Sequence, residues 1–225
     1  MQKEVTIALP KGKLGDEALG ILGKAGLPVE NVLTESRQLL FHFPREQIRY
    51  IICRPTDIPI YVDYGAADMG IVGKDTVVEA GAEVFELVDL KFGRCRFVAA
   101  VPKQVAAEYH KSGQGLSYFD RVRVATKFPR VAQEYFAGKG MQVEVLKLHG
   151  NIELAPRVGL AEMIVDIVST GRTLAENDLV PVADIFEATA RLIANRVSYR
   201  IHHHRMHTIV EHLRLAVGNG GEQKC

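Results

Sequence analysis

The 225-residue sequence contains no tryptophan, only three cysteines and no excess of charge of either sign. Its 28 Lys and Arg residues stand against 27 Asp and Glu residues, giving a net charge of +1, whereas nucleic-acid-binding proteins usually carry a basic excess. The cysteines show no paired spacing, which argues against a disulfide framework or a zinc knuckle and fits a reducing compartment. The first apolar stretch, Val5–Leu9, is too short for a signal peptide or a membrane span. We therefore expect a cytoplasmic protein with no nucleic-acid or membrane partner.

Short β-branched runs alternate with helical patterns along the chain, which is typical of βαβ units and predicts an α/β protein. The expected strands are Val5–Leu9, Arg49–Cys53, Ala67–Val72, Arg94–Val101, Val122–Ala125, Gln142–Leu146 and Met163–Val168. The expected helices are Asp16–Ala25, Thr56–Tyr64, Lys74–Ala80, Pro129–Lys139 and Leu154–Leu160, with a further helical pattern over residues 182–214.

Two punctuated segments suggest that one lobe is inserted into another. A charged stretch lies at Lys91–Arg96, and turn-forming residues lie at Asn177–Pro181. We expect a first lobe of residues 1–95 plus 178–225 and a second lobe of residues 96–177. Two chain crossings would place a cleft between the lobes, where ligands usually bind.

The most informative segment is DIVSTGRTL, residues 166–174, where an apolar strand meets a small-residue loop and then a helical pattern. Backbone N–H groups of such a loop converge on an anion, and the start of a helix favours negative charge. The candidate ligands are Asp166, Ser169, Thr170, Gly171, Arg172 and Thr173. A simple helix cap explains the same residue types, so both interpretations stay open here. No Walker pattern occurs, which excludes P-loop ATPase chemistry as the main competitor.

The run ELAPRVGLAEMIVDIVSTGRTL, residues 153–174, closely resembles the signature of ATP phosphoribosyltransferase, the first enzyme of histidine biosynthesis. Shorter matches are LPKGK at 9–13, ESR at 35–37, RPTDIP at 54–59, GAADMGIVGKD at 65–75 and ATK at 125–127. The resemblance implies transfer of the phosphoribosyl group of phosphoribosyl pyrophosphate to N1 of ATP, with release of pyrophosphate and with Mg2+ as cofactor. It also implies a two-lobed α/β fold of the type II periplasmic-binding-protein kind.

The resemblance also implies a site map. Phosphoribosyl pyrophosphate is expected at Glu153, Asp166, Ser169, Thr170, Gly171, Arg172 and Thr173 in the second lobe. ATP is expected on the first lobe at Lys11, Gly12, Lys13, Arg54, Asp68, Gly70 and Gly73. Arg37, Lys13 and Arg54 are expected to be catalytic, because negative charge grows on the leaving pyrophosphate. The metal ligands stay unassigned.

Ordinary structural roles compete with several of these assignments. Lys11 and Lys13 also fit a solvated pair at a helix start, although a bound anion explains cations there better. Gly70 and Gly73 fit turn requirements nearly as well as a nucleotide wall, and Asp68 fits either a cap or a Mg2+ ligand. The cluster His202, His203, His204 and His207 fits a polar helix face or a partner contact better than a nickel or zinc site.

The length of the chain resembles the short form of the family, which lacks a C-terminal regulatory domain. Members of that form work with a separate regulatory subunit similar to histidyl-tRNA synthetase. We therefore expect a homodimer that joins such a subunit in a hetero-oligomer.

Three rival functions remain at this point. The main alternative is a two-lobed small-molecule binding protein without catalysis, against which the loop at 166–173 and the missing signal peptide both count. The second alternative is an effector-binding domain of a transcription regulator. Such a protein would need a DNA-binding helix-turn-helix, and the residues before Val5 are too few to form one. A phosphoribosyltransferase with another acceptor is the third alternative.

Overall fold

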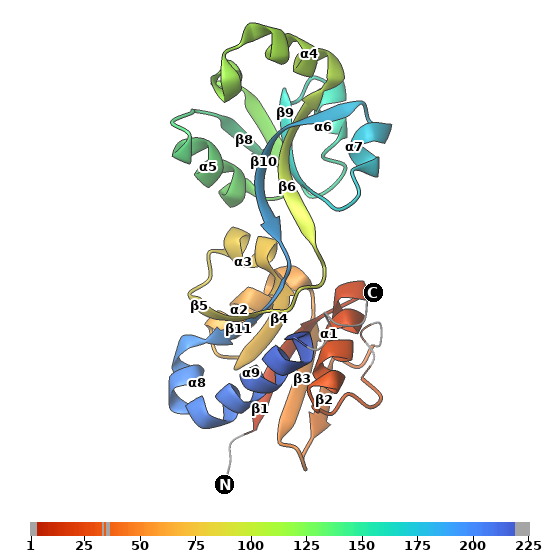
Figure 1. Ribbon diagram of the computed structural model, residues 1–225, viewed down its shortest axis with the longest axis vertical. Coiled ribbons are helices and arrows are strands. Elements are labelled where there is room, and N and C mark those ends of the chain that lie inside the picture. The colour runs from red at the N-terminus through yellow and green to blue at the C-terminus, as the bar shows by residue number, and fades with distance from the viewer. Residues whose placement is uncertain (1–3, 33, 35–36, 219–225) are drawn as a thin grey trace. The chain divides into compact units, whose positions relative to one another are not determined.

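The computed structural model describes residues 4–32, 34 and 37–218, and the chain divides into two compact units (Figure 1). Unit 1 comprises Met1–Gly93 and Thr189–Cys225, and unit 2 comprises Arg94–Ala188. The first crossing lies close to the expected boundary after residue 95. The second lies beyond the expected boundary after residue 177, because β10 (Leu179–Ala188) pairs along its length with β6 (Cys95–Pro102) and so belongs to unit 2.

Unit 1 is built on a six-stranded sheet of order β2-β3-β1-β4-β11-β5. Its strands are β1 (Val5–Pro10), β2 (Leu40–Phe43), β3 (Ile48–Cys53), β4 (Met69–Gly73), β5 (Val84–Asp89) and β11 (Ala190–Asn195). Its helices are α1 (Lys13–Lys24), α2 (Ile58–Asp63), α3 (Lys74–Ala80), α8 (Arg196–Ile201) and α9 (His203–Gly218), with a 3-10 turn at Pro55–Asp57. β1 runs parallel to both β3 and β4, so the carboxyl ends of these three strands share one edge.

Unit 2 is built on a five-stranded sheet of order β10-β6-β9-β7-β8. Its remaining strands are β7 (Arg123–Thr126), β8 (Glu144–Lys147) and β9 (Met163–Val168). Its helices are α4 (Lys103–Ser112), α5 (Pro129–Gly138), α6 (Leu154–Arg157) and α7 (Arg172–Glu176), with a 3-10 turn at Gly115–Phe119. β7 is parallel to β8 and β9, whereas β6 is antiparallel to β9 and β10.

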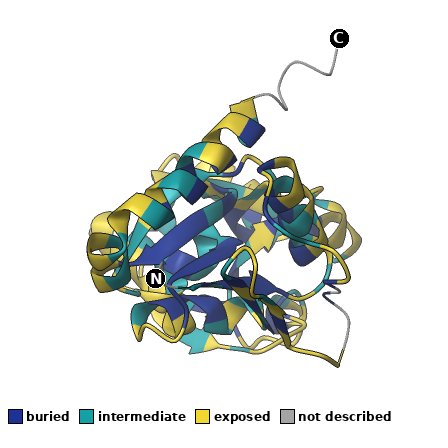
Figure 2. Ribbon diagram, turned by 90° about the horizontal axis from the view of Figure 1, so that it is seen from below, coloured by how far each residue is buried: buried dark blue, intermediate teal, exposed yellow. Residues whose placement is uncertain are grey.

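Each unit has an apolar core of its own. In unit 1, Leu22 of α1 and Leu213 of α9 are fully buried in the same cluster as Leu9 of β1. In unit 2, Ile164 of β9 packs in a cluster with Leu174 of α7. The central strands of each sheet are largely buried, while the helices keep exposed outer faces (Figure 2). Within the described part of the chain, no helix combines the length and apolarity needed to cross a bilayer.

The helical pattern expected over residues 182–214 is wrong in its first half. Residues up to Asn195 form β10 and β11, and helix begins only at Arg196. β10 carries two register shifts against β6, between Pro181 and Ala183 and between Asp184 and Phe186. These irregularities interrupt the alternation of inward and outward side chains, so the sequence loses the two-residue period of a strand.

Gly15 of α1 is required by close packing at the carboxyl end of β1. A Cβ atom at this position would lie 2.0 Å from the backbone oxygen of Pro10 and 2.6 Å from Cγ2 of Thr34. The backbone of Pro10 cannot move aside to admit a Cβ atom as the end of a flexible side chain could. We therefore predict that Gly15→Ala lowers the free energy of unfolding by about 1–3 kcal/mol.

Urea unfolding of Gly15→Ala and of a control variant, Gly20→Ala, checks this prediction. Gly20 lies in the same helix with nothing within 4 Å of a Cβ atom, so Gly20→Ala is the matched control. We expect the control to raise stability by about 0.5–1 kcal/mol, since alanine favours helix over glycine. Equal stability of Gly15→Ala and wild type would contradict the packing argument.

Candidate active site

A pocket of about 110 Å³ lies where β9 ends in unit 2. All seven residues expected to bind phosphoribosyl pyrophosphate line it: Glu153, Asp166, Ser169, Thr170, Gly171, Arg172 and Thr173. Drug-sized ligands occupy roughly 300–1,000 Å³, so the pocket suits one group of a larger ligand, such as a phosphate.

The loop that forms this pocket follows from the strand before it and the helix after it. β9 pairs with β7 along its first half, up to Val165, and with β6 as far as Val168, so pairing with β6 fixes its carboxyl end. Gly171 then adopts φ 79°, a left-handed conformation that glycine reaches without steric cost, and α7 starts at the next residue. The turn leaves Ser169, Thr170 and Thr173 exposed, so their hydroxyl groups remain accessible to a ligand.

The charged form of Asp166 is disfavoured by its surroundings. Burial raises the pKa of Asp166, and the nearby charge of Glu153 raises it further. The Ile167 N–H, 2.9 Å from Oδ1 of Asp166, and the charge of Lys127 act in the opposite direction. Lys127 follows β7, the parallel neighbour of β9, so it belongs to the same edge of the sheet. Hydroxyl donors or a cation at this place would relieve the repulsion.

Cationic residues gather along one edge of the unit 1 sheet. Lys11 follows β1 and Arg54 follows β3, and the Lys11 N–H donates to the Cys53 carbonyl at 3.1 Å. Arg37 shortly precedes β2, whose start lies beside the end of β3, since the Ile52 N–H donates to the Leu39 carbonyl at 2.8 Å. Lys13 begins α1 next to this edge. All four residues are exposed.

Local sequence explains how these turns form. Gly12 has φ 75°, so the chain turns from β1 into α1 in a conformation that favours glycine. Arg54 precedes Pro55, which keeps its backbone extended at φ −68° and ψ 141°. Of the matched segment 35–37, Glu35 and Ser36 lie outside the described residues.

Of three further residues expected to bind ATP, two lie away from the cationic edge. Asp68 lies before β4, at the opposite end of the parallel strands, and its Oδ2 accepts a hydrogen bond from the Thr6 N–H at 2.9 Å. A Cβ atom on Gly70 would lie 2.7 Å from Ile58 of α2, so this glycine allows helix packing. Gly73 ends β4 at the cationic edge, and a Cβ atom there would lie 2.0 Å from Oδ1 of Asp75. Thus only Gly73 of the three lies with Lys11 and Arg54.

The sequence analysis missed Gly15, which holds α1 against the end of β1. Its signal was present as a second glycine in the KGKLG segment, three residues after Gly12. The histidine cluster lies at the junction of α8 and α9, with His202 between the helices and the others in the first turns of α9. The rings of His203 and His207 stack with centroids 5.2 Å apart. The described residues contain no group of three His, Cys, Asp or Glu residues that could hold a metal ion.

A small-residue loop that opens a helix in one unit and a cationic sheet edge in the other are typical of α/β proteins that bind phosphorylated ligands. Solved structures support the two-lobed type II fold. A periplasmic sulfonate-binding protein of Methylobacillus flagellatus aligns over 99% of this chain and 70% of its own, with 13% identity and a TM-score of 0.61. This likeness confirms the expected fold and says nothing of function, and the interlobe cleft stays a prediction.

Sequence comparison narrows the class to one family. The family model HisG, described as ATP phosphoribosyltransferase, matches residues 54–215. The ATP phosphoribosyltransferase of Moorella thermoacetica is 66% identical over 97% of this chain and 96% of its own. That of Desulfitobacterium hafniense is 57% identical over 95% and 96%. A structure of the HisG:HisZ complex of Thermotoga maritima aligns over 96% of this chain and 99% of that chain, with 32% identity and a TM-score of 0.78.

The chain therefore belongs to the ATP phosphoribosyltransferase family. Membership favours the catalytic interpretation over a binding protein without catalysis. The short-form interpretation is also confirmed, because the matches cover nearly the whole length of these relatives and the structural relative is a HisG:HisZ complex.

Because the pKa of Asp166 is raised in the folded protein, we predict that its ionised form lowers the free energy of unfolding. A raised folded-state pKa contributes stability below the unfolded-state value, and that contribution is lost as the pH rises through the folded-state value. At pH 7 the neutral variant Asp166→Asn should therefore unfold at a higher temperature than wild type. The difference should shrink toward zero below about pH 3, where the wild-type residue is largely protonated in both the folded and the unfolded state.

Glu162 offers a control of opposite sign. A hydrogen bond from Arg123 lowers the pKa of Glu162, so Glu162→Gln should unfold at a lower temperature at pH 7. Calorimetry at pH 7 and at about pH 3 compares the variants. A less stable Asp166→Asn at pH 7 would contradict the electrostatic account.

Proposed function

We propose that this protein transfers the 5-phosphoribosyl group of phosphoribosyl pyrophosphate to N1 of ATP, giving N1-(5-phosphoribosyl)-ATP and pyrophosphate. This reaction is the first step of histidine biosynthesis. The observation that carries the proposal is the convergence of seven residues of the family signature on one pocket in unit 2. A cytoplasmic location belongs to the proposal.

In this proposal the unit 2 loop binds phosphoribosyl pyrophosphate. The N–H groups and hydroxyls of residues 169–173 hold the 5′-phosphate, and Asp166 and Glu153 accept hydrogen bonds from the ribose hydroxyls. Donation from a sugar hydroxyl to Asp166 stabilises a carboxylate whose charge burial disfavours. The small volume of the pocket supports a phosphate there rather than a whole nucleotide.

The unit 1 edge is proposed to bind the triphosphate of ATP and to stabilise the leaving pyrophosphate. Lys11, Lys13, Arg37 and Arg54 supply positive charge where negative charge develops, and Gly12 and Gly73 allow close approach of the backbone. The ribosyl centre becomes oxocarbenium-like as pyrophosphate departs, so the protein acts by positioning and electrostatics. N1 of adenine attacks through a lone pair and carries no proton, so no general base is needed.

Mg2+ fits the donors that the chain offers. Glu153 and Asp166 supply carboxylate oxygens in one pocket, and their mutual repulsion favours a bound cation. Mg2+ commonly takes one or two carboxylates and completes its coordination with substrate phosphates and water. When bound, the ion would neutralise charge on the pyrophosphate group. Asp68 is a poorer donor, because its carboxylate is buried against the start of β1.

The proposal includes a homodimer that joins a regulatory subunit similar to histidyl-tRNA synthetase. The HisG:HisZ complex of Thermotoga maritima supports a hetero-oligomer of this kind. Histidine inhibition should then require the second subunit.

The decisive activity test follows the ultraviolet absorbance of the N1-ribosylated adenine in the presence of ATP, phosphoribosyl pyrophosphate and Mg2+. We predict turnover by wild type and losses of about 10- to 100-fold in kcat/KM for Arg54→Ala and Thr173→Ala, the range expected for hydrogen bonds to charged groups. Lys111→Ala, an exposed lysine near the end of α4, is the charge-matched control and should keep full activity.

Turnover with unaltered rates in both variants would keep the reaction and overturn the site map. Absence of turnover with and without the regulatory subunit would overturn the proposed function. Replacement of ATP by other nucleotides or free bases identifies the acceptor.

The partner proposal predicts a change in assembly. By mass photometry, the protein alone should have twice its chain mass of 24.9 kDa, and addition of the HisZ-like subunit should produce a larger species. A monomer that does not respond to the subunit would contradict this part of the proposal.

A further inference from the structure

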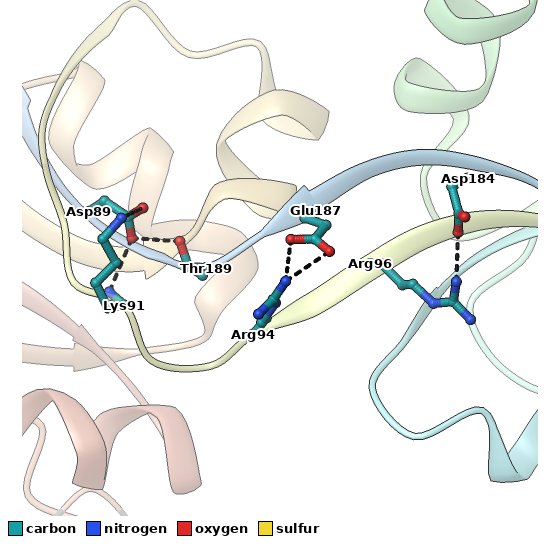
Figure 3. A network of polar contacts seen from close by, with 7 residues as sticks. All are labelled: Asp89, Lys91, Arg94, Arg96, Asp184, Glu187 and Thr189. Atoms are coloured by element: carbon teal, nitrogen blue, oxygen red, sulfur yellow. Dashed lines mark hydrogen bonds and ion pairs between the residues drawn. The ribbon is translucent and has the colours of Figure 1, made fainter. Parts of the chain in front are cut away.

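The two crossings between the units are joined at their unit 1 ends by one carboxylate. Asp89 ends β5 just before the first crossing, and Thr189 stands at the second crossing. Oδ1 of Asp89 accepts hydrogen bonds from the Thr189 hydroxyl at 2.6 Å and from the Lys91 N–H at 3.0 Å. Oδ2 lies 2.8 Å from Nζ of Lys91 and 3.2 Å from Nη1 of Arg191. Figure 3 shows Asp89 between Lys91 and Thr189.

Backbone hydrogen bonds continue this connection. The Leu90 N–H donates to the Ala190 carbonyl, and the Ala190 N–H donates to the Phe92 carbonyl, each at 2.9 Å. The Lys74 N–H donates to the Thr189 carbonyl at 3.0 Å, which ties the second crossing to the start of α3. The roots of both crossings thus form one hydrogen-bonded assembly on the unit 1 sheet.

The first crossing also contacts the candidate ATP edge. A Cβ atom on Gly93 would lie 2.7 Å from Cδ1 of Leu14, the residue after Lys13. Gly93 has φ 62°, a left-handed conformation that glycine adopts without steric cost, and its lack of a side chain leaves room for Leu14. The first crossing and the first turn of α1 therefore lie close together.

In unit 2, two ion pairs connect the start of β6 with the end of β10. Nη2 of Arg94 lies 2.9 and 2.7 Å from the two carboxylate oxygens of Glu187, and Nη1 of Arg96 lies 2.8 Å from Oδ1 of Asp184 (Figure 3). These ion pairs are exposed, and exposed ion pairs contribute little to stability.

The Asp89 side chain in unit 1 is less accessible, with 22% of it exposed. Burial alone would raise the pKa of Asp89, but hydrogen bonds from Lys91 and Thr189 and the charge of Arg191 lower it to about 2.

We propose that Asp89 and Thr189 are positioning residues for the transfer reaction, and that their hydrogen bond makes the two crossings move as one hinge. Without it, each crossing bends independently and the protein spends less time in the arrangement that brings the two substrates together. Substrate binding to either unit alone is untouched, while the apparent rate constant falls in proportion to the competent fraction. The effect on turnover rests on the proposed function, whereas the hydrogen-bonded clamp does not.

The test compares Thr189→Val, which removes the hydroxyl at nearly constant volume, with Thr189→Ser, which restores it. Thr208→Val is the matched control, because its hydroxyl donates to the His204 carbonyl on α9 at 2.9 Å. Hydrogen exchange of peptides containing Leu90 and Ala190 reports on the clamp. Steady-state kinetics and calorimetric titration of ATP alone report on positioning.

We expect Thr189→Val to speed exchange at Leu90 and Ala190 about 10-fold, in line with loss of a hydrogen bond to a charged group. Its kcat/KM should fall about 3- to 10-fold while its affinity for ATP alone stays at the wild-type value, and Thr189→Ser should restore both readouts.

Unchanged exchange in Thr189→Val would overturn the clamp. An equal loss of ATP affinity and turnover would overturn the positioning role, because it indicates damage to unit 1. A wild type without turnover would overturn the proposed function and the positioning role with it, while exchange would still decide whether the clamp exists.

Discussion

Parallel strand pairing decides where charge gathers in each unit of this protein. β1, β3 and β4 run in the same direction, so the turns after them open on one edge, and those turns carry Lys11, Arg54 and Gly73. β7 and β9 do the same in unit 2, where Lys127 and the loop at 169–173 follow. Ligands of open α/β sheets bind outside the carboxyl ends of strands for this reason. The chain also crosses between the units at these edges, since Gly93 follows β5 and Ala188 ends β10.

The chemistry proposed for the protein needs little beyond such edges. Two polyanionic substrates must be held, and charge on a departing pyrophosphate must be stabilised, which cations and backbone N–H groups do without a reacting side chain. The site residues accordingly lie on turns shaped by glycine, such as Gly12 and Gly171, rather than in a buried catalytic constellation. Asp166 is the exception, because it is partly buried beside Glu153, and both burial and the charge of Glu153 raise its pKa.

The sequence predicts well those parts of the site that come from one continuous segment of the chain. The loop from Asp166 to Thr173 is one segment whose strand, turn and helix can be recognised from neighbouring residues, and the structure brings its members together with Glu153. The cationic edge is harder, because Lys11, Arg37 and Arg54 are far apart in sequence and meet only through strand order. Asp68 falls at the other end of the sheet although it is close in sequence to Gly73. β10 was mistaken for helix because its register shifts hide the strand period.

The central claim is that each substrate has its own unit, and hydrogen exchange of the intact protein with one substrate at a time tests it most directly. Phosphoribosyl pyrophosphate with Mg2+ should protect the segment at 166–173, and ATP with Mg2+ should protect the segments at 11–13 and 53–57. Protection of the unit 1 segments by phosphoribosyl pyrophosphate alone, with no change at 166–173, would contradict the account.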